Sequence, residues 1–381
     1  MGGSHNRTSL QSHLVGATRC TYEVRLGGGG IDFSPYDIDY KNQICYTLWD
    51  IMIKNKVTII GDGGWGTALA LLLYSKGVSP VLWSVSPEYA EDLRKNRENR
   101  KFLKGISLPA GLTITSQDSH VLDSEYVFFV VPCEYLRQVA QRFKSGKFKY
   151  VVSATKGIEK SSLKRPSEIL AEYFSPEKVS ILSGPSISFE VARGIPTTVV
   201  IASYEKDGGA VQNLLMTENF RVYTSGDVIG VELGGALKNI IAIAAGISDG
   251  LGFGTNSKAA ILTRGLAEIT RLGVKMGADM TTFSGLSGMG DLATTCISTD
   301  SRNRWLGEEI GKGRSVEEIM RTTEVVVEGA ATCKSAHELA KKYGVEMPIT
   351  EKVYEVLYNK KNPAEAVKEL MTRSKKEENG L

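Results

Sequence analysis

The sequence lacks the cysteine pattern that a zinc site or a disulfide framework requires. The five cysteines are odd in number and widely scattered, with no C-x-x-C pair: Cys20, Cys45, Cys133, Cys296 and Cys333. Structural zinc sites and disulfide scaffolds need closely spaced or evenly paired cysteines. This usage fits a protein of the reducing cytoplasm, and no metal site is predicted.

The sequence also lacks a strong charge of either sign and a long apolar run. Its 46 basic and 43 acidic residues leave a net charge of +3, and no basic run alternates with aromatic residues. A nucleic-acid partner is therefore not expected. The run IIAIAAGI is far shorter than the roughly 18 residues of a membrane-spanning helix, so no membrane insertion is expected either. A chain of 381 residues suits two domains that share a cleft.

Residues 1–51 differ from the rest of the chain. They are polar at the start, contain the flexible segment RLGGGG and show no sustained hydrophobic period. They also lack the apolar core of a signal peptide and the acid-poor composition of a transit peptide. Met52 then opens MIKNKVTIIG, directly before a predicted strand. We interpret residues 1–51 as a loosely ordered or non-native extension, and a regulatory arm remains the alternative.

A glycine-rich turn follows the first predicted strand. The segment KVTIIGDGGWGTALALLLYSKG predicts a strand, a G-x-G-x-x-G turn at Gly61, Gly63 and Gly66, and a helix. In such a turn the glycines allow a tight bend, close approach of a pyrophosphate and close packing of helix on strand. The helix N-terminus offers free N–H groups to the phosphates. The order of elements predicts a dinucleotide site, with a turn that binds no ligand as the alternative.

The next predicted strand, PVLWSV, leaves the choice of cofactor open. An acid at its end would bind a ribose hydroxyl, and a base would bind a 2′-phosphate. Ser84, Val85 and Ser86 stand there instead. NAD and NADP are therefore both compatible with the sequence.

Strands and helices continue to alternate after this point. EYVFFVVP, KYVVSATKG and KVSILSGPS are continuous apolar runs, as expected of buried parallel strands. Ligands bind beyond the carboxyl ends of such strands, where Lys156, Gly184 and Ser186 fall. A surface turn lysine is the alternative for Lys156. The alternation stops after GIPTTVVIAS, and helices are predicted from about Gly230. The predicted fold is a Rossmann-type α/β domain with a doubly wound parallel sheet over 52–229, followed by an all-helical domain over 230–381.

The segment GVELGGALKNIIAIAAGISDG, residues 230–250, predicts an apolar helix with Lys238 and Asn239 at its centre. At about 100° per residue, the following side chains share a core face: Leu233, Leu237, Ile240, Ala244 and Ile247. Lys238 lies on another face, bordered by glycines and alanines that leave room for a backbone or a ligand. Partial burial would lower the pKa of its ammonium and suit it to proton transfer near neutrality. A lysine that snorkels to solvent is the alternative.

Histidine, the usual proton-transfer residue, is scarce. The four histidines lie in the first 51 residues, in a polar loop and on a charged helix: His5, His13, His120 and His337. A dinucleotide enzyme that interconverts an alcohol and a carbonyl needs a group that exchanges the proton of the oxygen. Lys238 is therefore the better candidate.

Two further clusters complete the predicted site. FSGLSGMGDLATTC is a glycine-rich loop that delivers Asp291 and Thr295, and Asp291 would either orient the lysine or cap the next helix. In STDSRNRW, Arg302 and Asn303 follow a serine at a predicted helix start. The planar fork of arginine binds phosphate oxygens in pairs, and a helix N-terminus adds N–H donors. This cluster predicts a phosphate on the substrate.

Six segments in this order resemble the bacterial-type NAD(P)-dependent glycerol-3-phosphate dehydrogenase family: GDGGWGTALA, TKGIE, LSGPSISFEVA, GVELGGALKNIIAIAAGISDGLGFGTNSKAA, GLSGMGDLATTC and SRNRWLGE. The similarity covers nearly all of the chain after the first 51 residues. It implies a helical domain of the 6-phosphogluconate dehydrogenase superfamily type. It also implies reversible reduction of dihydroxyacetone phosphate to sn-glycerol 3-phosphate by NADH or NADPH, which supplies phospholipid synthesis. A homodimer is usual in similar families.

The resemblance also implies roles for individual residues. Lys238 and Asp291 match the catalytic lysine and its partner. Substrate contacts are matched by Lys156, Gly184, Ser186, Arg302 and Asn303, with Ser301 beside them, and their places in the predicted helices add Asn239 and Thr295. Cofactor contacts are expected from Gly61, Gly63, Gly64, Trp65, Gly66, Ser188, Val326 and Glu328, with Lys156 and Arg302 serving both ligands.

The chain departs from the family pattern at two places in the glycine turn. Asp62 and Gly64 stand where the family often has alanine and serine, so one serine contact to the cofactor is missing. Two other functions stay open. One is a two-domain dehydrogenase of the same superfamily that acts on another oxo acid, and the other is a non-catalytic nucleotide-sensing module in which Lys238 would be dispensable.

Overall fold

The computed structural model describes residues 56–204, 208–322, 327–375 and 377–378. The interpretation of residues 1–51 and the cofactor contact expected from Val326 fall outside these ranges.

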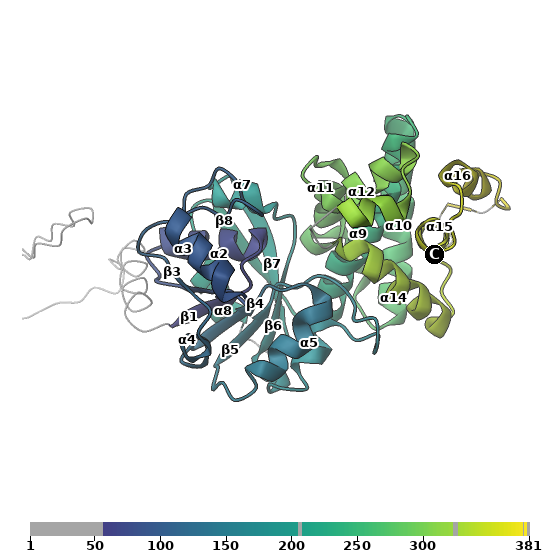
Figure 1. Cartoon of the computed structure of the whole chain (residues 1–381). Helices are drawn as coiled ribbons and strands as arrows, with labels where there is room; N and C mark the ends of the chain where they lie inside the picture. Colours follow the sequence, from purple (N-terminus) through teal and green to yellow (C-terminus); the bar gives the residue numbers. More distant parts are fainter. Residues whose placement is uncertain (1–55, 205–207, 323–326, 376, 379–381) are drawn as a thin grey trace, which may run out of the picture. The chain divides into compact units, whose positions relative to one another are not determined.

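An eight-stranded sheet forms the core of the first half of the described chain (Figure 1). Its strand order is β3-β2-β1-β4-β5-β6-β7-β8. The bounds are β1 (Val57–Ile60), β2 (Val81–Trp83), β3 (Thr113–Thr115), β4 (Tyr126–Phe129), β5 (Tyr150–Ser153), β6 (Val179–Ser183), β7 (Thr197–Ser203) and β8 (Phe220–Ser225). All neighbouring pairs are parallel except β6 with β7, which is antiparallel.

Helices cover both faces of this sheet, which explains why the strands β1, β4, β5 and β6 are buried along their whole length. Ile59 and Phe128 pack into one apolar cluster, whereas their neighbours Ile60 and Phe129 pack into another. The first cluster includes residues of α2 (Gly64–Ser75), α3 (Pro87–Asn96), α7 (Ser188–Ala192) and α8 (Gly208–Leu215). The second includes residues of α4 (Asp118–Leu122), α5 (Cys133–Arg142) and α6 (Pro166–Leu170). The doubly wound α/β architecture predicted from the sequence is confirmed.

The alternation of strands and helices extends further than predicted. After β7 the chain adds α8 and β8, and β8 pairs in parallel with β7. The prediction that alternation stops after GIPTTVVIAS is therefore wrong. The first residues of β8 alternate between buried and exposed, as in a strand with one face in solvent. Their apolar signal in the sequence is therefore weak.

The second half of the described chain is helical and surrounds one long helix, α9 (Val228–Gly250). The other helices are α10 (Thr255–Lys275), α11 (Asp291–Ile297), α12 (Arg302–Gly311), α13 (Val316–Thr322), α14 (Glu328–Tyr343), α15 (Pro348–Tyr358) and α16 (Pro363–Met371). Helices α10, α11, α12, α14 and α15 all contact α9. At the crossing with α12, a Cβ on Gly246 would overlap the carbonyl oxygen of Arg304, and a Cβ on Gly307 would overlap that of Ile243. Glycine is therefore required for the close approach of these two backbones.

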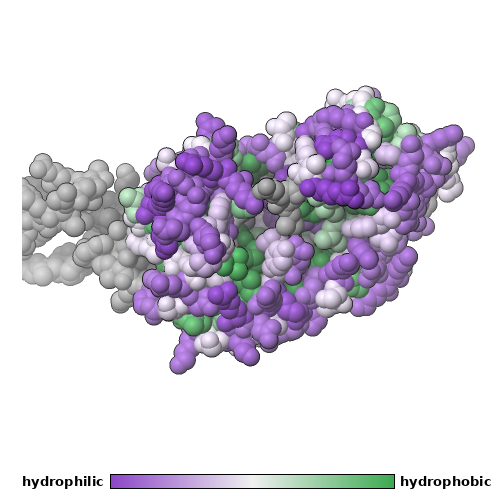
Figure 2. Space-filling view, viewed as in Figure 1, coloured by the Kyte–Doolittle hydropathy of each residue, from purple (hydrophilic) through white to green (hydrophobic). Residues whose placement is uncertain are grey.

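Helix α9 is buried on every side, so the single core face predicted for it is wrong. Its apolar residues are buried except Ile229 and Ala244, which are partly buried, and Lys238 and Asn239 are buried as well. Its composition and length alone would allow it to cross a membrane, but 89% of its most apolar window is buried by other parts of the chain. It is a core helix, and its all-round apolar character follows from that position. The face shown in Figure 2 is mainly hydrophilic, with scattered hydrophobic patches.

Candidate active site

The glycine turn between β1 and α2 has the shape of a pyrophosphate cradle. Gly61 has a φ of +117°, and a Cβ there would overlap the carbonyl oxygen of Val130. A Cβ on Gly66 would overlap the carbonyl oxygen of Gly61, so helix and turn need glycine at both places. Gly63 borders open space, with none of the described atoms within 4 Å of the position of a Cβ. It is also the N-cap of α2, without a side-chain cap among the described residues, so the first N–H groups of the helix remain available for phosphate. The turn therefore fits a dinucleotide.

The loop after α3 closes over this turn. Asn99 is fully buried, and its Nδ2 donates hydrogen bonds to the carbonyl oxygen of Asp62 and to Oγ1 of Thr67, both at 2.7 Å. A Cβ on Gly64 would lie 2.9 Å from the carbonyl oxygen of Phe102. This contact gives a physical reason for glycine where the related family often has serine.

The central feature of the site is an ion pair between Lys238 and Asp291. Lys238, in the middle of α9, is 6% exposed, and its Nζ lies 2.5 Å from Oδ1 of Asp291. Nζ also donates a hydrogen bond of 2.6 Å to Oγ1 of Thr295, one turn further along α11. The Thr295 hydroxyl donates its own proton to the carbonyl oxygen of Asp291 at 2.7 Å, so it can only accept from the lysine. The side chain of Lys238 therefore does not reach solvent. The side chain of Asp291 makes no cap hydrogen bond at the start of α11 and holds Lys238 instead.

Lys156 shares the same carboxylate. It lies just beyond β5, and its Nζ is 2.6 Å from Oδ2 of Asp291 and 3.3 Å from the carbonyl oxygen of Gly184. The two oxygens of Asp291 thus each hold one ammonium, one from the sheet half of the chain and one from α9. The Lys156 side chain is 17% exposed and so is more open to solvent than that of Lys238, which is 8% exposed. The alternative of a surface turn lysine is excluded.

Close packing brings these groups together. A Cβ on Gly234 would overlap the carbonyl oxygen of Ser287 in the turn that precedes α11, and a Cβ on Gly235 would lie 2.5 Å from Oγ of Ser183. The small residues next to Lys238 therefore admit a neighbouring backbone on one side and the end of β6 on the other. At that end Gly184 has a φ of +128°, and the hydroxyl of Ser186 donates a hydrogen bond of 3.0 Å to its carbonyl oxygen.

The electrostatics of the site favour a reactive lysine. Burial lowers the pKa of Lys238 from 10.5 to about 8, the Asp291 carboxylate opposes this shift, and the Lys156 ammonium adds to it. Burial also raises the pKa of the Glu328 carboxyl to about 7, against the pull of the charges of Arg302, Lys156 and Lys238. Lys238 can therefore give up and take back a proton near neutral pH.

The start of α12 supplies further polar groups. Ser301 is the N-cap, and its Oγ accepts a hydrogen bond of 3.2 Å from the N–H of Arg304. Arg302, the first residue of the helix, is exposed. Nδ2 of Asn303 donates to Oδ1 of Asn239 at 3.0 Å, and Oδ1 of Asn303 accepts from the N–H of Gly329 at 2.9 Å. The two asparagines thus hold one another beside Lys238.

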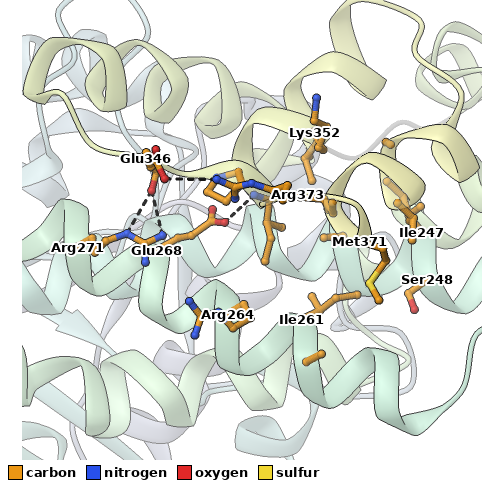
Figure 3. Close-up of a pocket in the computed structure, with 18 of the residues that line it drawn as sticks. Ile247, Ser248, Ile261, Arg264, Glu268, Arg271, Glu346, Lys352, Met371 and Arg373 are labelled. Carbon is orange, nitrogen blue, oxygen red and sulfur yellow. Dashed lines mark hydrogen bonds and ion pairs between the residues drawn. The ribbon is translucent and has the colours of Figure 1, made fainter. Parts of the chain in front are cut away.

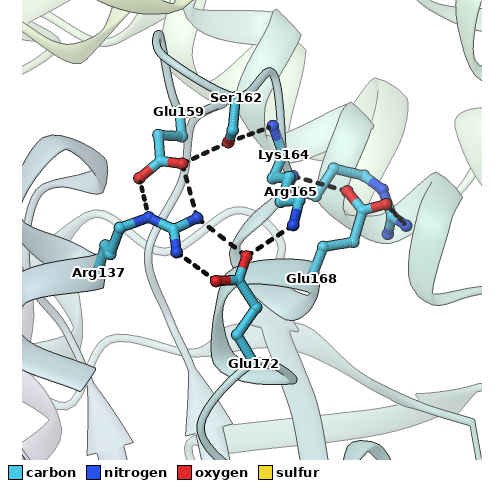
Figure 4. Close-up of polar contacts among 7 residues, drawn as sticks. All are labelled: Arg137, Glu159, Ser162, Lys164, Arg165, Glu168 and Glu172. Carbon is cyan, nitrogen blue, oxygen red and sulfur yellow. Dashed lines mark hydrogen bonds and ion pairs between the residues drawn. The ribbon is translucent and has the colours of Figure 1, made fainter. Parts of the chain in front are cut away.

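A network of ion pairs supports the loop that carries Lys156 (Figure 4). Arg137 on α5 binds Glu159 through two hydrogen bonds, Nε to Oε1 at 2.8 Å and Nη2 to Oε2 at 2.9 Å. Arg137 also pairs with Glu172. The hydroxyl of Ser335 on α14 donates a hydrogen bond of 3.1 Å to the carbonyl oxygen of Ile158. The residues that directly follow Lys156 are therefore fixed from both halves of the chain.

Some residues of the site were not singled out by the sequence. Ser183 is buried next to Gly235, and its Oγ has no hydrogen-bond partner within the described ranges. Its place as the last residue of β6 was the available signal, because strand ends form ligand sites in parallel sheets. Asn99 lies in a polar run after α3, where no pattern distinguishes it. The histidines of the described chain lie elsewhere, on α4 and on α14, where His337 stacks on Tyr354.

Three further residues that were predicted as cofactor contacts lie at the starts of helices. Trp65 is the second residue of α2, and Ser188 begins α7. The Cβ of Ser188 would lie 3.6 Å from a Cβ on Gly64, at the edge of the glycine turn. Glu328 begins α14. Together, the dinucleotide turn and the buried lysine on a helical second half define a two-domain, nicotinamide-dependent dehydrogenase.

Comparison with known proteins identifies the family. Residues 56–208 match the model of the NAD-dependent glycerol-3-phosphate dehydrogenase N-terminus, and residues 227–368 match the model of its C-terminus. The chain is 50% identical over 327 residues to glycerol-3-phosphate dehydrogenase [NAD(P)+] of Thermoanaerobacter sp., covering 85% of this chain and 98% of the relative. It is 48% identical over 333 residues to the enzyme of the same name from Pelotomaculum thermopropionicum, covering 86% and 95%. The crystal structure of glycerol-3-phosphate dehydrogenase from Coxiella burnetii is also similar, with 36% identity, a TM-score of 0.80, and 84% and 99% of the two chains covered. The chain belongs to the NAD-dependent glycerol-3-phosphate dehydrogenase family.

Proposed function

We propose that the chain catalyses reversible reduction of dihydroxyacetone phosphate to sn-glycerol 3-phosphate with NADH or NADPH. The observation that carries this proposal is the buried Lys238, held by Asp291 and Thr295 at the carboxyl ends of the strands. The glycine turn at Gly61, Gly63 and Gly66 would hold the dinucleotide, whose nicotinamide would supply the hydride. The Lys238 ammonium donates a proton to the carbonyl oxygen as negative charge develops there, and the neutral amine accepts it in the reverse reaction.

The second oxygen of Asp291 and the second lysine complete the proton-transfer site. Asp291 stabilises the charged form of Lys238 against the desolvation that lowers its pKa. Lys156, on the other oxygen of the same carboxylate, adds positive charge that attracts an anionic substrate. We infer that Asn239 orients the substrate from the position next to Lys238, because its amide is held by Asn303.

The phosphate of the substrate is proposed to lie at the start of α12. Arg302 there offers a planar fork of N–H donors, and Ser301 and Asn303 flank it. Gly184 and Ser186 are proposed as further substrate contacts, since they follow β6 next to Lys156. The cofactor contacts proposed are Gly61, Gly63, Gly64, Trp65, Gly66, Lys156, Ser188, Arg302 and Glu328.

We also propose a division of the chain into a dinucleotide-binding domain over 52–229 and a helical domain over 230–381. The last strand ends at Ser225 and α9 begins at Val228, which supports a boundary close to residue 229. We further propose that the protein is cytoplasmic and does not insert into membranes. The buried, unpaired state of Cys133, Cys296 and Cys333 and the core position of α9 support this.

Finally, we propose that two copies associate through a groove on the helical half, whose lining combines apolar side chains with the charged ones labelled in Figure 3. The groove has a volume of about 1100 Å³ and is lined by side chains of α10, α15 and α16 such as Ile261, Val353 and Leu370. Met371 beside it is 80% exposed, and a second copy would remove this apolar surface from water. Light scattering should show a dimer of the whole chain that Met371→Glu weakens. A monomer at micromolar concentration would contradict the proposal.

A steady-state assay tests the proposed reaction. NADH or NADPH consumption should be fast with dihydroxyacetone phosphate and slow with oxo acids that carry no phosphate, because those lack the group that Arg302 binds. Faster turnover of an oxo acid would instead indicate a dehydrogenase of another specificity. Nucleotide binding without turnover of any of these substrates would indicate a nucleotide-sensing module.

A further inference from the structure

An acidic side chain of the glycine turn reaches the carboxyl end of the neighbouring strand β2. Strand β2 ends at Trp83, and the next residue, Ser84, is fully buried. The Ser84 hydroxyl donates a hydrogen bond to the carboxylate of Asp62. The N–H of Gly61 donates to the carbonyl oxygen of Trp83 at 3.0 Å, which brings the turn against the end of β2. The Asp62 carboxylate therefore lies beyond β2, although it comes from the turn after β1.

The end of the second strand decides which nucleotide a Rossmann domain accepts. An acid there accepts hydrogen bonds from the hydroxyls of the adenosine ribose, and a base there accommodates the 2′-phosphate of NADP. In this chain Ser84, Val85 and Ser86 occupy the strand end, and none of them is charged.

We propose that Asp62 takes the place of the strand-end acid. Its carboxylate accepts hydrogen bonds from the adenosine ribose hydroxyls of NADH and repels the 2′-phosphate of NADPH, so the chain prefers NADH. This inference rests on the dehydrogenase function proposed above and adds a determinant of cofactor specificity to it.

The surrounding residues hold Asp62 in this position. The carbonyl oxygen of Asp62 accepts a hydrogen bond from the buried Asn99, whose Oδ1 in turn accepts one of 2.6 Å from the hydroxyl of Tyr89. The backbone is thus fixed by the loop after α3, and the carboxylate is fixed by Ser84. A preorganised acceptor discriminates better between ligands, because it cannot turn away from an unfavourable charge.

One nearby cation would favour NADPH over NADH. Burial raises the pKa of Asp62 overall, and the Ser84 hydrogen bond and, more weakly, the charge of the exposed Lys101 oppose this rise. A lysine in this region would attract a 2′-phosphate. The Asp62 carboxylate is hydrogen-bonded directly at the end of β2, so we expect its repulsion to decide the preference.

Calorimetric binding of NADH and NADPH to the whole chain tests the inference without any substrate. The protein should bind NADH at least about tenfold more tightly than NADPH, as expected for a like charge placed against the 2′-phosphate. Asp62→Asn and Asp62→Ala should remove most of this ratio, chiefly by tightening NADPH. Glu88→Gln is the matched control, because Glu88 is an exposed acid on α3 whose carboxylate accepts a hydrogen bond of 2.8 Å from Ser86, close to the same strand end. It should leave the ratio unchanged.

Equal binding of the two nucleotides, a preference for NADPH, or an unchanged ratio in both folded Asp62 variants would overturn the inference. A change in the ratio with Glu88→Gln that matches the change with Asp62→Asn would overturn it as well. Thermal unfolding of each variant shows that it is folded. If NADH binds with the expected preference but dihydroxyacetone phosphate is not reduced, the proposed function fails while the assignment of Asp62 stands.

Discussion

Replacing Lys238 by methionine is the sharpest test of the site. Methionine keeps the length and apolar character of the side chain while it removes the ammonium that lies 2.5 Å from Asp291. General acid catalysis typically contributes about 10²–10⁴-fold. We therefore expect turnover of dihydroxyacetone phosphate to fall by that factor, while nucleotide affinity stays near the wild-type value.

The structure also predicts the effect on stability. Removing one partner of a buried ion pair commonly lowers the free energy of unfolding by about 3–5 kcal/mol, because the other charge is left uncompensated. In Lys238→Met, however, Asp291 keeps its ion pair with Lys156. In the other direction, the shift of the Lys238 pKa from 10.5 to about 8 corresponds to about 3 kcal/mol of unfavourable environment for the ammonium at neutral pH. Methionine removes that cost. These effects offset each other, so the free energy of unfolding should change by less than about 2 kcal/mol.

The pH dependence gives the test a second readout. Reduction needs the ammonium of Lys238, so its rate should be flat below about pH 8 and fall above it. Oxidation of glycerol 3-phosphate needs the neutral amine, so its rate should rise up to about pH 8 and level off. Lys238→Met should lose both transitions.

Lys76→Met is the matched control for this experiment. Burial lowers the pKa of Lys76 to about 8 as well, but its Nζ binds the carbonyl oxygens of Asn213 and Leu214 at the end of α8. Its substitution should leave turnover and the pH profile unchanged. Near-native turnover in a folded Lys238→Met protein, or an equal loss with Lys76→Met, would refute the assignment of Lys238 as the proton-transfer group.

Three further substitutions or truncations test other parts of the proposal. Arg302→Ala should raise the KM for dihydroxyacetone phosphate by about 10- to 150-fold, equivalent to about 1.5–3 kcal/mol. Arg302→Lys should raise the KM less, because lysine keeps the charge but not the planar fork. An unchanged KM in Arg302→Ala would place the phosphate elsewhere. Gly66→Ala should abolish calorimetric nucleotide binding, because its Cβ would overlap the carbonyl oxygen of Gly61; wild-type affinity would contradict the geometry of the turn. A chain that begins at Met52 should keep full activity, because β1 begins at Val57; a large loss of turnover would show that the preceding residues are needed.

The sheet was predictable from the sequence because burial on both faces leaves an unbroken apolar signal. The runs that contain Phe128, Val152 and Ile181 became the parallel strands β4, β5 and β6. The direction of β7 was not predictable in the same way. An apolar run such as TTVVIAS looks the same in either direction, and the short connection from β6 through α7 places it antiparallel to its neighbour. Strand β8 has exposed residues in alternation, so its signal resembled that of a loop.

The residues of the candidate site and the pairing of Lys238 with Asp291 were predictable, but the second ion pair of Asp291, with Lys156, was not. Topology alone indicated that Lys156 and Gly184 lie at one edge of the sheet, because the carboxyl ends of parallel strands lie together. No sequence rule indicated that Asp291 would also bind Lys156, since these two residues are far apart in the chain. The helical period also failed to identify the face of Lys238, because α9 is buried on every side.

The buried position of Lys238 explains why an apolar helix carries an ammonium at its centre. In water the ammonium would keep a pKa near 10.5 and would seldom release its proton at neutral pH. The apolar surroundings of α9 lower that pKa, and the single carboxylate of Asp291, shared with Lys156, keeps the charged form present without cancelling the effect. If Asp291 were paired with Lys238 alone, the pKa of the Lys238 ammonium would be higher. The sharing of Asp291 between two lysines therefore adjusts the proton affinity of Lys238, and it also leaves net positive charge for a phosphorylated substrate.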